Sequence, residues 1–190
     1  MILPIVAFGD PVLKKMAAEI PPDYPKLDEL IQNLFDTMYN AKGVGLAAPQ
    51  VSKSVRLFVV DAKPFSEDAE TEEEKMLGNF RQIFINAKII EESGTEWKFN
   101  EGCLSIPKVR EDVLRKPKIK IRFVDENFKE HVRTYEGIAA RIVQHEYDHI
   151  EGKLFTDRIS PLRKRLILGK LNDISRGKIE VDYKMKFPKK

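Results

Sequence analysis

The sequence predicts an α+β fold, with mostly antiparallel β-sheets packed around a central helix that carries a metal-binding His-Glu-x-x-His (HExxH) motif. Residues 119–124 and 128–135 have β character and flank the turn-prone Asp125-Glu126-Asn127, which is typical of a hairpin. From Glu136 or Gly137 to about Ile150 the apolar residues recur at helical spacing. No regular alternation of strands with helices is visible, and this favours antiparallel over parallel sheets.

The remaining elements follow from periodicity and from helix start and stop signals. Helices are predicted over residues 12–18, 26–42 and 161–171, and strands over 55–60, 80–90 and 178–187. The last strand rests on strict alternation, since Ile179, Val181, Tyr183 and Met185 alternate with charged residues. Residues 66–75 contain six carboxylates and one lysine, so we expect a solvated surface loop there. We expect one domain that spans residues 1–190.

Composition limits the classes of function. The chain has 190 residues, of which 42% are hydrophobic, and a formal net charge of +3, too small an excess to argue for DNA as a partner. No run of 18 apolar residues and no signal-peptide pattern is present, so we expect no membrane partner. Cys103 is the single cysteine, which rules out an intrachain disulfide. We therefore expect a cytoplasmic protein.

The motif His145-Glu146-Tyr147-Asp148-His149 carries the chemistry. The two histidines are four residues apart, so on a helix their imidazoles lie on one face and can bind a single cation. Glu146 lies beside them, where a carboxylate can take a proton from a water molecule and return it. These residue types at this spacing predict a metal-dependent hydrolase.

The third ligand is not supplied downstream. Phe155 stands where a metzincin has its third histidine, and Leu168-Gly169-Lys170 occupies the place of the glutamate in thermolysin-like enzymes. Upstream, His131 lies in a charged strand and is expected to be exposed, whereas Cys103 offers a thiolate. A site with two His and one Cys leaves a fourth position for water, as catalytic sites do. Gln50 ends the glycine-containing loop 43–50 and is a candidate donor to an oxyanion.

Three segments in this order, residues 43–50 (GVGLAAPQ), 101–105 (EGCLS) and 144–149 (QHEYDH), resemble the peptide deformylases. The resemblance extends from residue 2 to about residue 161. It implies that Cys103, His145 and His149 hold the metal, typically Fe(2+), for which Zn, Ni or Co can substitute. Glu146 would be the general base, and Gln50 and the Leu104 N–H would stabilise the oxyanion. The implied substrate-binding residues are Val44, Gly45, Phe99, Gly102, Arg110, Ile138 and Ile142.

The implied activity is removal of the N-formyl group from the formyl-methionine of newly made polypeptides, with release of formate. Residues 66–75 look like an insertion relative to shorter family members. The ribosome is a second candidate partner, through the basic residues Arg163-Lys164-Arg165 and Lys170. Two alternatives stay open: a zincin-like metallopeptidase, which would not use Cys103 as a ligand, and a non-catalytic ribosome-associated binding protein.

Overall fold

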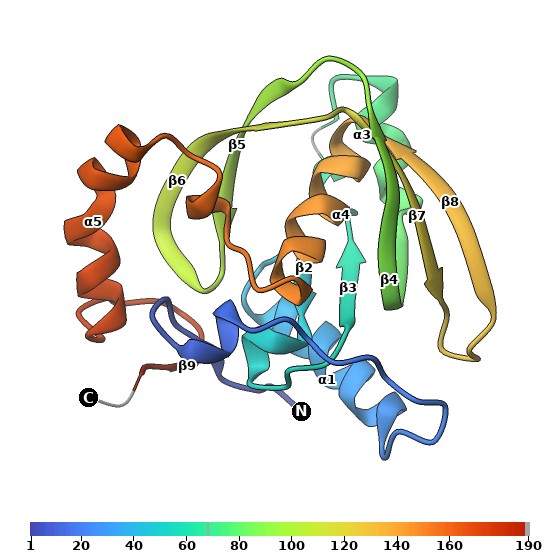
Figure 1. Cartoon of the computed structure of the whole chain (residues 1–190), viewed down its shortest axis with the longest axis horizontal. Helices are drawn as coiled ribbons and strands as arrows, with labels where there is room; N and C mark the ends of the chain where they lie inside the picture. The colour runs from blue at the N-terminus through green and yellow to red at the C-terminus, as the bar shows by residue number, and fades with distance from the viewer. Residues whose placement is uncertain (68, 189–190) are drawn as a thin grey trace.

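The computed structural model describes residues 1–67 and 69–188 (Figure 1). Its strands are β1 (Ile5–Val6), β2 (Gly45–Ala47), β3 (Leu57–Asp61), β4 (Arg81–Ser93), β5 (Trp97–Cys103), β6 (Ile106–Arg115), β7 (Lys118–Val124), β8 (Glu130–Glu136) and β9 (Met185–Lys186). Its α-helices are α1 (Leu27–Asn40), α2 (Pro64–Glu67), α3 (Glu72–Met76), α4 (Gly137–Ile150) and α5 (Pro161–Ser175). The 3-10 helices are η1 (Pro11–Lys14), η2 (Ala48–Val51), η3 (Leu77–Asn79) and η4 (Phe155–Asp157).

The strands pair mostly antiparallel, and the predicted α+β class is confirmed in this form. Five strands form one sheet in the order β2-β3-β4-β7-β8, with every neighbouring pair antiparallel. Strands β5 and β6 make a separate antiparallel hairpin. The exception is the short pair formed by β1 and β9, which is parallel and joins the two ends of the chain.

Helix α4 lies between the five-stranded sheet and the β5–β6 hairpin (Figure 1). Its apolar face packs into a core that contains Phe58, Phe84, Ala140, Val143 and Ile150. Gly137 begins the helix with φ +57°, a left-handed conformation that glycine adopts without steric cost. None of the helices in the described part of the chain combines the length and apolar composition needed to cross a membrane.

The N-terminal helix expected over residues 12–18 is shorter in the structure, because tertiary contacts take its backbone groups. Only η1 forms, with the Asp10 side chain accepting a hydrogen bond from the Val12 N–H at 3.0 Å. The Ala17 N–H donates to the Ile150 carbonyl and the Ala18 N–H to the Ser54 carbonyl, at 2.9 and 3.0 Å. These bonds replace the ones that a longer helix would have made.

Two other segments differ from expectation. The strand expected over residues 178–187 is reduced to β9, although Ile179, Val181, Tyr183 and Met185 do alternate in burial with exposed charged residues. The acidic stretch 66–75 is not a plain loop, since α3 begins within it at a Thr71 capping box. Its Glu73 carboxylate accepts a hydrogen bond at 2.8 Å from the Ile138 N–H, and so caps the first turn of α4.

Candidate metal centre

Three potential ligands meet where the end of β5 approaches α4. One donor atom from each of Cys103, His145 and His149 lies within 4.8 Å of the others. Cys103 Sγ is 3.4 Å from His149 Nε2. A shift in the β5–β6 register between Gly102 and Cys103 pairs Cys103 with Ile106, so the strand ends in a tight turn at the thiol. The residues predicted as metal ligands are therefore brought together.

The electrostatics of this cluster suit a divalent cation. Burial alone would raise the pKa of the Cys103 thiol, but the His149 and His145 imidazoles lower it to about 5. The lowered pKa favours the thiolate, the form that binds metals. One thiolate and two imidazoles are ligands that Fe(2+), Zn(2+) and their neighbours accept, so the residues present fit such a cation.

Glu101 orients one of the histidines, a role that the sequence pattern alone did not indicate. His145 Nδ1 lies 2.9 Å from Glu101 Oε2, which leaves His145 Nε2 to face the cluster. The two oxygens of Glu101 also accept hydrogen bonds of 2.7 and 2.9 Å from Arg115. Glu101 and Cys103 are two residues apart on β5, so they share one face of the strand. This spacing is the feature of the sequence that could have identified Glu101 as a neighbour of the metal ligands.

A buried ionic network extends behind Glu101. Arg141 Nη1 donates to Glu101 Oε1 at 2.9 Å, and Arg115 Nη1 donates to Asp148 Oδ2 at 2.7 Å. Arg158 donates two further hydrogen bonds, both 2.6 Å, to the Asp148 carboxylate. Burial would raise the pKa of Asp148, but Arg158 and Arg115 hold this pKa below its ordinary value. Asp148, one of the two unspecified positions of the His-Glu-x-x-His motif, thus ties α4 to β6 and to the segment after η4.

Gln50 reaches the cluster from η2, with its amide orientation fixed by the backbone. Its Oε1 accepts a hydrogen bond from the Ala47 N–H at 2.9 Å. The amide nitrogen therefore faces the site, 3.5 Å from Cys103 Sγ and 3.2 Å from Ser105 Oγ. This arrangement presents an amide N–H donor beside the Cys103 sulfur atom.

Glu146 is buried next to the loop that contains Gly45. A Cβ atom added at Gly45 would lie 2.7 Å from Glu146 Cγ and Cδ, so only glycine leaves room for this carboxylate. Burial raises the pKa of Glu146 to about 7, although the His145 and His149 imidazoles act in the opposite direction. Such a pKa allows the group both to accept and to donate a proton near neutral pH.

A pocket of about 770 Å³ opens beside the cluster. The predicted residues on its wall are Val44, Gly45, Gln50, Phe99, Gly102, Cys103, Leu104, Arg110, Ile142, His145 and Glu146. Ile138 lies one turn before Ile142, is half-buried and packs against the core around Phe58 and Phe84; it is not among the described residues on the pocket wall. His131 is half-buried rather than exposed, and its Nε2 lies 2.6 Å from Asp125 Oδ2.

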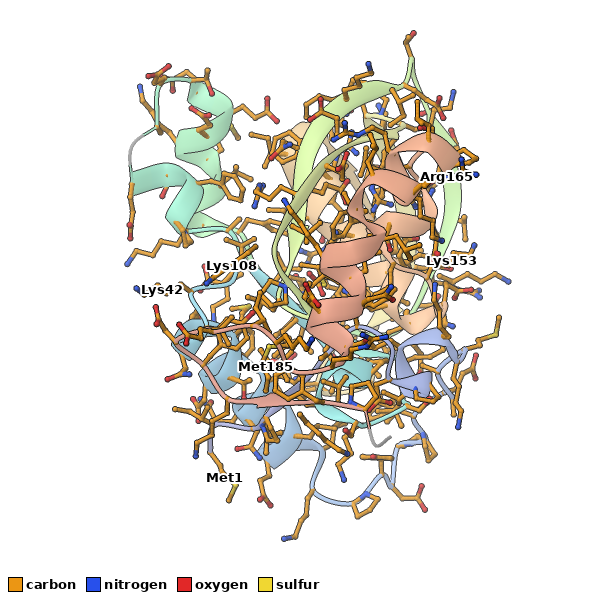
Figure 2. All side chains as sticks on the ribbon, turned by 90° about the vertical axis from the view of Figure 1, so that its left-hand side faces the viewer. Met1, Lys42, Lys108, Lys153, Arg165 and Met185 are labelled. Atoms are coloured by element: carbon orange, nitrogen blue, oxygen red, sulfur yellow. The ribbon has the colours of Figure 1, made fainter. Side chains whose placement is uncertain are left out.

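The C-terminal segment also borders this pocket, which the sequence analysis did not anticipate. Glu180, Val181, Asp182 and Tyr183 line it together with Lys42 and Lys108. Figure 2 shows this segment leaving α5, running toward Lys42 and returning to Met185. Burial, together with the negative charge of Cys103, raises the pKa of Tyr183 well above its ordinary value, so its phenol remains a hydrogen bond donor.

Comparison with known proteins places this site in a family. A sequence model of the polypeptide deformylase family matches residues 2–165, which include all three ligand candidates, Gln50 and Glu146. The chain belongs to the polypeptide deformylase family. Members of this family are metal-dependent hydrolases that act on peptides, so the chain belongs to an enzyme family of that class.

Individual relatives agree over most of the chain. It is similar to a peptide deformylase of Christiangramia forsetii, with 63% identity over 99% of this chain and 97% of the relative. A crystal structure of a peptide deformylase from Legionella pneumophila is similar with a TM-score of 0.78 and 36% identity, covering 94% of this chain and 98% of that one. The crystal structure of a peptide deformylase from Thermotoga maritima is similar with a TM-score of 0.73 and 38% identity. That match covers 85% of this chain and 99% of the Thermotoga maritima chain.

Proposed function

We propose that this chain removes the N-formyl group from the formyl-methionine at the start of newly made polypeptides, releasing formate. The carrying observation is that one pocket joins a possible His-His-Cys metal site to a buried carboxylate and an amide N–H donor. We further propose that residues 1–190 act as one catalytic domain, that α4 is the metal-binding helix around which the sheets are arranged, and that the reaction takes place in the cytoplasm.

We assign Cys103, His145 and His149 as the residues that hold the metal. A bound divalent cation would supply Lewis acidity and lower the pKa of water. Fe(2+) is the assignment that the family resemblance favours, with Zn, Ni or Co as substitutes; the ligand types alone do not select among them. Glu101 supports this role, since its hydrogen bond with Nδ1 directs the other ring nitrogen of His145 toward the cluster.

Glu146 is the proposed proton carrier. Its carboxylate accepts a proton from the attacking water and then donates it to the nitrogen of the departing amine. Burial raises the pKa of Glu146 above that of an exposed glutamate, which favours a carboxyl group that can both accept and return a proton. Gly45 allows the carboxylate to lie against the pocket loop.

Gln50 and the backbone N–H of Leu104 are the proposed donors to the oxygen that becomes negative as water adds to the formyl carbon. The Ala47 N–H holds the Gln50 amide so that its nitrogen is presented without reorganisation. Each such donor is typically worth about 2.7–4 kcal/mol in the transition state. Val44, Phe99 and Ile142 line the pocket and supply apolar surface for the methionine side chain, with Ile138, one turn before Ile142, as a further candidate. Gly45, Gly102 and Arg110 lie along the path of the peptide.

Formate release from a formyl-Met tripeptide tests this proposal. Wild type with its metal should release formate, and Glu146→Ala should lose nearly all activity while it keeps the metal. Cys103→Ala should lose both the metal and the activity. Cleavage of an internal peptide bond without formate would instead favour a zincin-like metallopeptidase. Binding of the tripeptide without any turnover would favour a non-catalytic binding protein. Co-sedimentation with ribosomes, compared between wild type and Lys170→Glu, tests the ribosome as a second partner.

A further inference from the structure

The C-terminal segment (residues 176–188) borders the pocket although it lies beyond the family match, which ends at residue 165. The relative from Christiangramia forsetii nevertheless aligns with 99% of this chain, so the similarity continues into this segment. The Thermotoga maritima structure covers only 85% of this chain. Part of the pocket wall is thus built from a portion of the chain that the family pattern does not include.

This segment is fixed in place by backbone and side-chain contacts. The Ile5 N–H donates to the Lys184 carbonyl and the Ala7 N–H to the Lys186 carbonyl, both at 2.9 Å. Three side chains spaced along the segment pack against the core formed by β6 and α5; they are Ile179, Met185 and Phe187. Figure 2 shows Met185 on the short stretch that returns beneath α5. Tyr183 is therefore held between two anchored points.

The phenol of Tyr183 reaches the turn that joins β5 to β6. Its Oη donates a hydrogen bond of 2.8 Å to the carbonyl oxygen of Leu104. The next carbonyl along the chain, that of Ser105, accepts a hydrogen bond of 2.8 Å from the Phe8 N–H. Two consecutive carbonyls of the turn are thus held by opposite ends of the chain. The same turn contains the Cys103 thiol and the Leu104 N–H.

We propose that Tyr183 is a positioning residue for the reaction, which it serves by fixing the Leu104 carbonyl and with it the orientation of the Cys103–Leu104 turn. The inference rests on the proposed function. Without this bond, the peptide group between Leu104 and Ser105 is held in the turn by fewer contacts. The backbone torsions of Leu104 are then less restrained, so the adjoining peptide group between Cys103 and Leu104, which carries the Leu104 N–H, can shift. This N–H is a proposed donor to the developing oxyanion. Its misplacement should therefore reduce the stabilisation of the transition state more than it reduces the affinity for the substrate.

The test uses Tyr183→Phe, which removes one oxygen atom and leaves the ring that packs against the core. Tyr39→Phe is the matched control. The Tyr39 phenol also donates one hydrogen bond, of 2.6 Å to Asp61 Oδ2, but its side chain is 47% exposed and not on the pocket wall. For each protein we would measure kcat and KM for a formyl-Met tripeptide, bound metal, the thermal midpoint, and hydrogen exchange of the Ser105 amide.

We expect Tyr183→Phe to lower kcat by about 3- to 10-fold, the range of one lost neutral hydrogen bond. KM and bound metal should stay unchanged, and the buried Ser105 amide should exchange faster than in wild type. Tyr39→Phe should match wild type in all of these properties.

The proposal is overturned if kcat of Tyr183→Phe stays within about twofold of wild type, or if Tyr39→Phe reproduces the loss. A fall in kcat that merely follows a loss of metal or of folded protein also overturns it, because that pattern is structural. Absence of formate release from metal-loaded wild type would instead refute the proposed function, and the exchange rate of Ser105 in the two variants would still decide whether Tyr183 holds the turn.

Discussion

Neutralising Glu101 is the perturbation that the structure predicts in most detail. Its two oxygens accept four hydrogen bonds of 2.7–2.9 Å, two from Arg115 and one each from Arg141 and His145. The carboxylate is buried, and so are its partners Arg115 and Arg141. In Glu101→Gln, one oxygen becomes an NH2 group that faces donors. Arg115 would keep its hydrogen bond to the Asp148 carboxylate, whereas Arg141 would lose the carboxylate that it contacts.

The expected loss of stability follows from leaving buried arginines without the negative charge of Glu101. Removing one partner of a buried ion pair typically costs about 3–5 kcal/mol, and the lower end applies here because Asp148 still accepts a hydrogen bond from Arg115. For a chain of this size, about 3 kcal/mol lowers the thermal midpoint by about 6–12 °C. Loss of the group that orients a histidine ligand should also weaken metal binding about 10- to 100-fold.

Urea unfolding and metal titration measure the two effects separately. Glu111→Gln is the control, because Glu111 lies opposite Glu101 in the β5–β6 hairpin and is also buried. Its partner Arg163 is 55% exposed and far more hydrated, so we expect a loss of at most about 1 kcal/mol and no change in metal binding. Stability within about 0.5 kcal/mol of wild type for Glu101→Gln would refute the reasoning, as would unchanged metal affinity.

The stability lost in Glu101→Gln should depend on pH in a direction that the pKa of Glu101 determines. Burial would raise the pKa of Glu101, but Arg115 and His145 hold it far below its ordinary value. A carboxylate with a lowered folded-state pKa contributes stability that is complete above the unfolded-state pKa of about 4.3. The difference in unfolding free energy between wild type and Glu101→Gln should therefore be constant at pH values well above about 4.3 and should narrow only at lower pH.

Three further substitutions probe the surroundings of the site. Gly45→Ala should displace the Glu146 carboxylate and lower kcat by about 100-fold or more with metal content retained, as steady-state kinetics and metal analysis would show. Glu73→Ala removes the cap from the first turn of α4 and should lower the free energy of unfolding by about 0.5–2 kcal/mol in urea. Burial would raise the pKa of Asp157, but its contacts with Lys14 and neighbouring groups lower it. The thermal midpoint of Asp157→Asn should therefore fall below that of wild type at neutral pH and converge with it as pH drops below about 4.

Local patterns were sufficient to predict the parts of the site that depend on short spacings. The interval of four residues between His145 and His149 places both on one face of α4, and helical periodicity located that helix at its observed start and end. Absence of a downstream ligand directed attention to Cys103, which the structure brings within reach of both imidazoles. The spacing and the periodicity are properties of a single helix, so they do not depend on which other segments of the chain pack against it.

Contacts between distant segments were not predictable in the same way. Ile138 has the residue type and helical position expected of a pocket wall, but it is half-buried against the core around Phe58 and Phe84 and is not among the described pocket-lining residues. Glu73 caps a helix that begins 64 residues later in the chain, and its exposed acidic surroundings indicated only a solvated loop. Neither outcome follows from periodicity, since each depends on which neighbour a side chain meets in three dimensions.

The C-terminal segment shows why a correct pattern still led to an incomplete structure. Alternation of apolar and charged residues over 178–187 identified which side chains are shielded, and burial follows it. A strand also needs a partner for its backbone, and β1 offers only Ile5–Val6, so pairing is limited to Met185–Lys186. The residues before this pair are not part of a sheet and lie along the pocket wall instead. In this position the Tyr183 hydroxyl donates its hydrogen bond to the Leu104 carbonyl. The short β1–β9 pair therefore does more than close the fold: it sets the position from which the end of the chain reaches the turn that carries Cys103.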